Sequence, residues 1–170
     1  MQALMFHQVG EPAEVLQLET LPSPTPASGE LLIKVQAANI NPSDLLFVRG
    51  LYGIRPQPPA AGGFEASGIV EQAGPDTNLP AGTQVSFVGQ GVWQEYVCVP
   101  EREVIPLPAE LNLSPEVACQ AFVNPLTAFG LLALSGLKKG DSVLLTAGAS
   151  ALGKMLIGLC KERGIKTYVT

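Results

Sequence analysis

The stretch Val143–Met155, VLLTAGASALGKM, decides how the C-terminal part of this chain folds. The apolar-rich run Ser142–Thr146 predicts a short strand, and the small residues after it predict a tight turn. Apolar residues at helical spacing then predict a helix over Leu152–Arg163 that ends at Gly164, with a second strand from Ile165. The order strand, loop, helix, strand is one βαβ unit, with which a doubly wound parallel sheet begins.

The turn inside this unit has the pattern of a phosphate-binding loop. Gly148 and Gly153 match the first and last glycines of the dinucleotide fingerprint, where a tight turn and close helix packing require glycine. Ser150 stands in place of the middle glycine, and its hydroxyl can donate to a phosphate. Ala151 and Leu152 bring free N–H groups at the start of the helix. We therefore predict that the loop binds a dinucleotide pyrophosphate; the alternative is that its small residues serve packing only.

The residues before Pro108 follow another pattern. They form short strand-like runs separated by Gly and Pro, among them LLIKVQAA, ASGIVEQAG, TQVSFVGQG and VWQEYVCVP. Such runs favour a β-barrel or sandwich. The pattern then changes, because Ser114-Pro115 and Asn124-Pro125 each have the form of a helix start. We predict a β-rich domain over residues 1–122 and an incomplete dinucleotide-binding domain over residues 123–170.

Composition argues against several classes of function. The 170 residues carry a net charge of −5 with scattered basic residues, so no nucleic-acid partner is expected. No apolar run reaches the roughly 20 residues of a membrane span, and the N-terminus lacks a secretory signal, so we expect a cytoplasmic protein without a membrane partner. His7 is the only histidine, and Cys98, Cys119 and Cys160 are widely separated. Neither a metal cluster nor a Ser-His-Asp triad is therefore expected.

In this context the sequence resembles the medium-chain dehydrogenase/reductase superfamily, and within it the zinc-independent quinone oxidoreductases and 2-enoyl thioester reductases. The resemblance covers the whole chain and is carried by AANINPSDLLFVRGLYG, GGFEASGIVEQAG, LPAGTQVSF, VNPLTAFGLL and LKKGDSVLLTAGASALG. It implies a GroES-like first domain for a small-molecule substrate, a Rossmann domain for a nicotinamide cofactor, and a homodimer for full-length members. NADPH is the implied cofactor and NADH the alternative, since the ribose-reading segment falls where the chain ends.

The resemblance also implies that the catalytic zinc site is absent. Zinc-dependent members have Cys and His ligands where this chain has Asn41 and Phe64. Neither an amide nor a phenyl ring replaces a thiolate or an imidazole as a zinc ligand. We therefore expect no zinc and no other metal.

Without a metal ion, another group must stabilise the charge that develops on the substrate oxygen. By resemblance, Tyr52 in RGLYG matches the tyrosine that supplies this O–H donor in the zinc-independent families, and the alternative is an aromatic plug on the barrel rim. Asn41 is expected to cap a helix, with Asp44 as its capping-box partner. By resemblance, Asn41 and Phe64 also line the cleft for nicotinamide and substrate.

Three further residues are assigned to this cleft, and each has an alternative role. Thr127 matches a threonine that approaches the nicotinamide, although a threonine in a first helical turn is also ordinary. Trp93 either walls the substrate pocket or anchors the core, and the core position is favoured. Asn124 lies near the position of a third zinc ligand of the metal enzymes, and a helix-capping role accounts for it.

Two hypotheses on function result. The first is a zinc-independent, NADPH-dependent reductase that transfers hydride to a quinone or to an α,β-unsaturated carbonyl such as a 2-enoyl thioester. The alternative is a truncated, catalytically inactive form or a binding module, because only two strands of the dinucleotide-binding sheet are expected within this chain.

Overall fold

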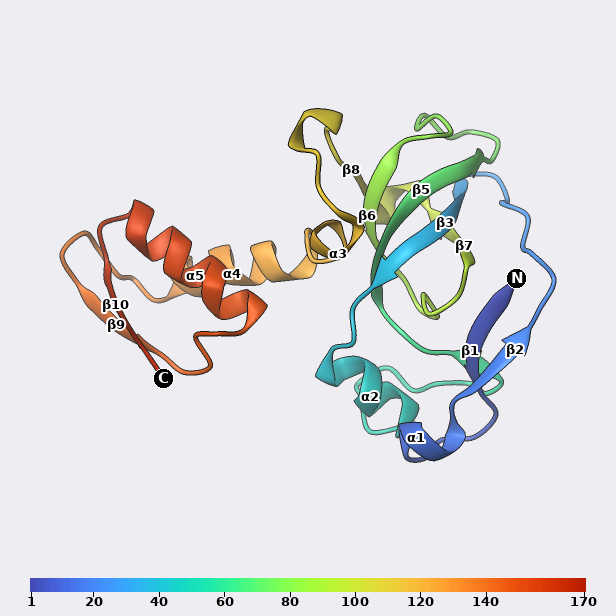
Figure 1. Cartoon of the computed structure of the whole chain (residues 1–170), viewed down its shortest axis with the longest axis horizontal. Coiled ribbons are helices and arrows are strands. Elements are labelled where there is room, and N and C mark those ends of the chain that lie inside the picture. Colours follow the sequence, from blue (N-terminus) through green and yellow to red (C-terminus); the bar gives the residue numbers. More distant parts are fainter. The chain divides into compact units, whose positions relative to one another are not determined.

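The computed structural model describes residues 1–170, which form two compact units, Met1–Gln120 (unit 1) and Ala121–Thr170 (unit 2) (Figure 1). The strands of unit 1 are β1 (Gln2–Phe6), β2 (Gln17–Thr20), β3 (Glu30–Ala38), β4 (Ala60–Ala61), β5 (Glu65–Ala73), β6 (Gln84–Val88), β7 (Tyr96–Pro100) and β8 (Val104–Pro106). Its helices are α1 (Pro12–Val15), α2 (Pro42–Val48), α3 (Pro115–Ala118) and the 3-10 turns η1 (Glu101–Glu103) and η2 (Ala109–Leu111). None of the helices has the length and apolar composition needed to cross a bilayer.

The larger sheet of unit 1 has the order β7-β3-β5-β6-β8, and all its pairs are antiparallel. β3 and β5 pair along their length, with irregular register between Leu32 and Ile33 and between Val35 and Ala37. Such irregularities bend a sheet and increase its twist. The strand-rich domain predicted from short, Gly- and Pro-bounded runs is confirmed.

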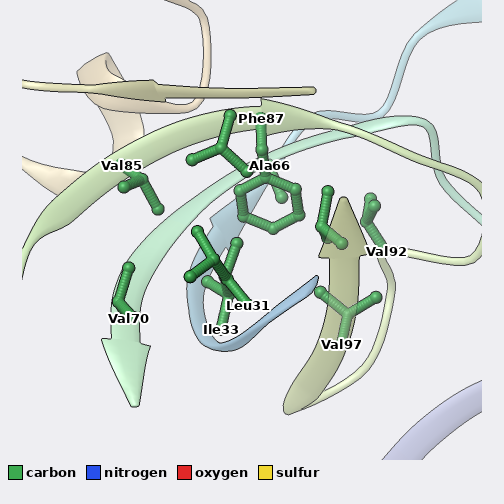
Figure 2. Close-up of a cluster of buried hydrophobic side chains, with 10 residues drawn as sticks. Leu31, Ile33, Ala66, Val70, Val85, Phe87, Val92 and Val97 are labelled. Carbon is green, nitrogen blue, oxygen red and sulfur yellow. The ribbon is translucent and has the colours of Figure 1, made fainter. Parts of the chain in front are cut away.

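The core of unit 1 lies on one face of this sheet. Leu32 of β3 is 8% exposed, and the residues on either side of it, Leu31 and Ile33, are fully buried. They pack with Val85 and Phe87 of β6 and with Ala66 of β5. Figure 2 shows these side chains directed toward one another between the strands.

A second, three-stranded sheet of unit 1 has the order β2-β1-β4. Beside it a smaller cluster buries Phe6, Val15, Phe47 and Val48, with Phe64 packed against it. Because Phe47 and Val48 belong to α2, this cluster holds the helix that precedes Tyr52.

Unit 2 contains α4 (Val123–Leu134), β9 (Ser142–Leu145), α5 (Ala151–Glu162) and β10 (Lys166–Val169). β9 and β10 pair in parallel, which confirms the predicted βαβ order. Leu132 of α4, Cys160 of α5 and Ile165 form the buried cluster of this unit.

The predicted capping role of Asn124 is wrong. α4 begins at Val123 and its N-cap is Phe122, so Asn124 lies within the first turn. The physical reason is the position of Pro125, whose missing N–H costs nothing anywhere in a first turn, where N–H groups have no intrahelical acceptor. The proline therefore allows the helix to start earlier than the Asn-Pro pair suggests.

Candidate active site

The candidate site of unit 1 is built around the start of α2. Asn41 is the N-cap in an extended conformation, and Pro42 occupies the first helical position. The Asp44 carboxylate accepts the Asn41 N–H over 2.6 Å. The predicted pairing of Asn41 with Asp44 is therefore present, and it fixes the backbone that enters the helix.

Asp44 is fully buried, and its Oδ1 atom has no hydrogen-bond partner. Burial raises the pKa of this carboxyl above its ordinary value, and the hydrogen bond from Asn41 opposes that effect. The charge of nearby Glu65 raises the pKa of Asp44 further. Burial and the charge of Glu65 therefore both disfavour ionisation of Asp44 at the start of α2.

Three aromatic rings follow one another from the core to the surface. The Phe47 and Phe64 rings meet edge to face with centroids 4.9 Å apart, and the Tyr52 ring lies 5.4 Å from Phe64. Tyr52 is 38% exposed, whereas Phe47 is buried. The structure thus brings Tyr52, the predicted donor, next to Phe64 and leaves the tyrosine partly accessible.

Asn39 connects this region to distant segments and was not singled out from the sequence. Its amide donates to the Glu65 carboxylate over 2.6 Å and to the Cys119 carbonyl over 2.9 Å, and it accepts from the Cys119 thiol over 3.0 Å. Its backbone carbonyl accepts the Trp93 indole N–H over 2.9 Å. We call this set the Asn39 network. Burial raises the pKa of the Cys119 thiol to about 11, so it stays protonated and can donate this bond.

Trp93 is half-buried against the core of the larger sheet. A Cβ placed on Gly62 or Gly63 would come within 2.3 or 2.5 Å of its indole ring, so both glycines are needed for this close approach. Trp93 also lines a shallow hollow of about 320 Å³ between β1 and β3. Neither Tyr52 nor Phe64 lines that hollow.

A second hollow, of about 430 Å³, lies at the loop that follows Tyr52. Phe47 forms its apolar side. Its other lining residues are Arg55, Gln57, Ala60, Ala61, Gln90 and Gly91. We call this hollow the Arg55 pocket. Its polar residues were not found from the sequence, because the loops that supply them are far apart along the chain.

In unit 2, the loop Gly148–Gly153 has the close packing that its glycines predict. A Cβ on Gly153 would lie 2.7 Å from the carbonyl oxygens of Ala147 and Gly148, so only glycine fits at this point of the helix. A Cβ on Gly148 would lie 2.7 Å from Val169 of the neighbouring strand. These two positions correspond to the packing roles of glycine in the dinucleotide fingerprint.

Ser150 has a role that the sequence interpretation missed. It is the N-cap of α5, and its Oγ atom accepts the Gly153 N–H over 3.0 Å. The first N–H groups of a helix have no acceptor within the helix. With Gly153 satisfied, Ala151 and Leu152 keep N–H groups at the N-terminus of a helix, which suits an anion. The preference of serine for N-caps was the sequence signal for this role.

The remaining predicted residues lie in α4. Thr127 is exposed, and its hydroxyl donates to the Val123 carbonyl one turn earlier over 2.8 Å. Asn124 is half-buried in the first turn. Unit 1 thus holds Asn41, Tyr52, Phe64 and Trp93, and unit 2 holds Asn124, Thr127 and the loop. No three His, Cys, Asp or Glu side chains of the chain are grouped so that they could hold a metal ion.

Comparison with known proteins identifies a matching domain family and related enzymes. The sequence profile of the alcohol dehydrogenase GroES-like domain matches residues 27–109. A mitochondrial enoyl-[acyl-carrier-protein] reductase of Caenorhabditis elegans is 34% identical over 98% of this chain and 49% of its own length, and the human protein of that name is 33% identical. The chain spans about half the length of the curated relatives it matches.

Solved structures agree with these relatives. The Escherichia coli quinone oxidoreductase complexed with NADPH has a TM-score of 0.89 at 29% identity, covering 99% of this chain and 52% of its own. The human synaptic vesicle membrane protein VAT-1 homolog-like protein has the same TM-score and identity, with 99% and 55% covered. Together with the β-rich architecture of unit 1 and the βαβ order of unit 2, these matches show that the chain belongs to the medium-chain dehydrogenase/reductase superfamily.

Proposed function

We propose that this protein acts in a zinc-independent, NADPH-dependent reductase that transfers hydride to a carbonyl-conjugated double bond, in a 2-enoyl thioester or a quinone. The observation that carries the proposal is the partly exposed Tyr52 packed beside Phe64. A phenol O–H lies next to the position at which zinc-dependent members have a ligand. The relatives named as enoyl reductases and quinone oxidoreductases support this oxidoreductase assignment.

NADPH, when bound, would supply the hydride. As hydride adds to the carbon conjugated with the carbonyl, the displaced π electrons move onto the carbonyl oxygen. Tyr52 donates its O–H hydrogen bond to that oxygen and stabilises the enolate or quinol anion. A proton from Tyr52 or from water completes the reduced product. Phe64 would shield the same oxygen from water, because its ring packs against Tyr52.

The loop of unit 2 fits the pyrophosphate of this cofactor. Glycines at 148 and 153 allow the backbone to close tightly, and the N–H groups of Ala151 and Leu152 begin α5 without an acceptor of their own. We propose that the cofactor pyrophosphate binds to this loop. By resemblance, Thr127 of unit 2 is expected to approach the nicotinamide. NADPH in the quinone oxidoreductase complex supports the choice of NADPH.

Between the two substrate classes we favour 2-enoyl thioesters. The curated relatives with this name are 33% to 36% identical to the chain. The quinone oxidoreductase structures are 29% to 32% identical in sequence to this chain, so quinones are the second proposed substrate class. The test is a substrate panel of enones, enoyl thioesters and quinones, with NADPH consumption as the readout.

Tyr52→Phe tests the proposed donor in the same assay. Loss of a donor that stabilises a developing oxyanion typically lowers kcat by about 10²- to 10³-fold, and we expect a fall of that size without a comparable change in the KM for NADPH. Tyr96→Phe on β7 is the matched control and is expected to retain the wild-type rate. A Tyr52→Phe variant that retains full turnover would contradict the donor assignment.

A titration of the purified chain with NADPH, followed by nicotinamide fluorescence, precedes the assay. Saturable binding in the micromolar range supports the cofactor assignment for this chain. Absence of binding would favour the alternative function, a binding module or catalytically inactive form of the family.

A further inference from the structure

We propose that the Arg55 pocket binds an oxyanion group of the substrate, a phosphate or a carboxylate, through the Arg55 guanidinium. The proposal rests on the proposed function, because it assumes that the substrate occupies the face of unit 1 that carries Tyr52. It adds a selectivity that the reaction itself does not require. Substrates with an oxyanion arm would bind more tightly than neutral quinones or enones.

The wall of the Arg55 pocket contains several hydrogen-bond donors. Arg55 contributes a fork of N–H donors, and Gln57 and Gln90 contribute amide groups that can also donate. No carboxylate lines the pocket. A guanidinium fork matches the paired oxygens of a carboxylate or phosphate, and the amides can satisfy the remaining lone pairs.

Arg55 forms no ion pair, although unit 1 is rich in acidic residues. All but two of the 15 acidic residues, Asp141 and Glu162, lie in unit 1, together with only four of the ten basic residues. Of these four, Arg49 pairs with Glu11 and Arg102 with Glu103. The other two are Lys34, which does not line the pocket, and Arg55, which forms no ion pair although carboxylates are abundant.

The Arg55 pocket lies near the proposed donor Tyr52. Phe47 forms one side of the pocket and packs on Phe64, which in turn contacts Tyr52. Arg55 follows Tyr52 by three residues, so their Cα atoms are at most about 11 Å apart. A single substrate could therefore reach the Tyr52 hydroxyl with its carbonyl and the guanidinium with an anionic arm.

The chain contains its own reporter for this pocket. Trp93 is the only tryptophan, and it packs against Gly62 and Gly63. Ala61, the residue before these glycines, and Gly91, two residues before Trp93, both line the pocket. Occupation of the pocket should thus change the fluorescence of Trp93.

The experiment is a titration of the purified chain followed by Trp93 fluorescence. The probes are a short 2-enoyl thioester of coenzyme A, the same thioester of pantetheine without phosphate, a short 2-enoic acid, a neutral enone, and NADPH. Arg55→Ala is compared with Arg55→Lys, which keeps the charge, and with Arg102→Ala, which removes an exposed arginine elsewhere in unit 1. Because no turnover is needed, this measurement is independent of hydride transfer.

We expect an oxyanion-bearing probe to bind at least about tenfold more tightly than its neutral counterpart, the usual effect of a charge-assisted hydrogen bond. Arg55→Ala should remove that advantage, while Arg102→Ala keeps it and Arg55→Lys retains part of it. Tighter binding of the coenzyme A thioester than of the pantetheine thioester identifies the bound oxyanion as a phosphate. Tighter binding of the 2-enoic acid than of the neutral enone identifies it as a carboxylate.

Equal affinity for charged and neutral substrate probes would overturn the proposal. So would an Arg55→Ala effect confined to NADPH, because the pocket would then belong to the cofactor. Failure of the proposed function would look different. The oxyanion advantage would persist in binding, whereas Tyr52→Phe would leave NADPH turnover unchanged.

Discussion

Unit 1 and unit 2 bury their apolar residues to very different extents. In unit 1, Phe87 of β6, in the five-stranded antiparallel sheet, is 0% exposed. In unit 2, Leu134 of α4 is 89% exposed and Leu144 of β9 is 63% exposed. In unit 1, a closed core and long-range hydrogen bonds therefore fix the positions of the site residues. Unit 2 presents its loop on a single βαβ unit with little burial to support it.

The largest expected effect in this comparison is on the core of unit 1. Phe87→Ala should lower the free energy of unfolding by about 3 to 5 kcal/mol, because it removes a buried ring and leaves a cavity. Leu134→Ala in unit 2 should change it by no more than about 0.5 kcal/mol, because the side chain already faces solvent. Urea unfolding followed by Trp93 fluorescence for unit 1 and by circular dichroism for the whole chain measures both. Similar losses in the two variants would remove the contrast between the units.

The Asn39 network provides the second test. Asn39→Ala removes hydrogen bonds to the Glu65 carboxylate and the Cys119 carbonyl, and hydrogen bonds to charged groups contribute about 1.5 to 3 kcal/mol. We expect a loss of stability of that size and a shifted Trp93 emission. Asn78→Ala is the matched control, because Asn78 also donates to a glutamate, Glu101, but on the surface. An equal, small effect of both substitutions would show that the network does not stabilise unit 1.

Substitutions at two glycines of α5, Gly153 and Gly158, provide a third test, within unit 2. Gly153→Ala places a Cβ against two carbonyl oxygens, so it should cost about 1 to 3 kcal/mol and weaken NADPH binding. Gly158→Ala, in the same helix, meets no atom within 4 Å and should stabilise the helix by about 0.5 to 1 kcal/mol. Thermal unfolding and the nicotinamide titration measure both. If Gly153→Ala behaved like Gly158→Ala, the tight loop would be unnecessary.

The smallest expected effect is a pH dependence at Asp44. Burial raises the pKa of Asp44 above its ordinary value of 3.8, so the native state binds this proton more tightly than the unfolded state does. Stability from this group is therefore present at low pH and falls as pH rises from the ordinary value through the raised one. Asp44→Asn, which can still accept the Asn41 N–H, should remove that fall and flatten the dependence of the unfolding free energy on pH.

Glu101→Gln on the surface of unit 1 tests the opposite sign. Hydrogen bonds from the backbone N–H groups of Leu79 and Asn78 lower the pKa of Glu101. Its contribution is present above the ordinary pKa and is lost as pH falls through the lowered value. Asp44→Asn and Glu101→Gln should thus change the pH profile in opposite directions. Changes in the same direction would contradict the assigned causes.

The elements that the sequence predicted correctly are those with local patterns. Short strand-like runs between Gly and Pro marked β3 and β5, and the order around Gly148 and Gly153 marked the βαβ unit, because such signals act within a few positions. The family resemblance, which the comparisons confirm, supplied Tyr52 and Phe64 together. Tyr52 and Phe64 are neighbours in space because the Phe64 ring packs against both Phe47 of α2 and Tyr52.

The residues that the sequence did not reveal depend on contacts between distant segments. Asn39 meets Trp93 and Cys119, which are 54 and 80 positions away, and no local pattern signals such a bond. The pocket joins Arg55 to Gln90 in the same way. The capping role predicted for Asn124 was wrong for a different reason, since a proline in the first turn is compatible with several helix starts.

The division of the chain at Gln120 also separates its charges. Unit 1 has an excess of acidic residues, whereas unit 2 has six of the ten basic residues and only Asp141 and Glu162 as acids. The isoelectric points of the two units therefore lie on opposite sides of neutrality, although the whole chain is acidic. After limited proteolysis at the junction, native electrophoresis at neutral pH would carry the two fragments toward opposite electrodes.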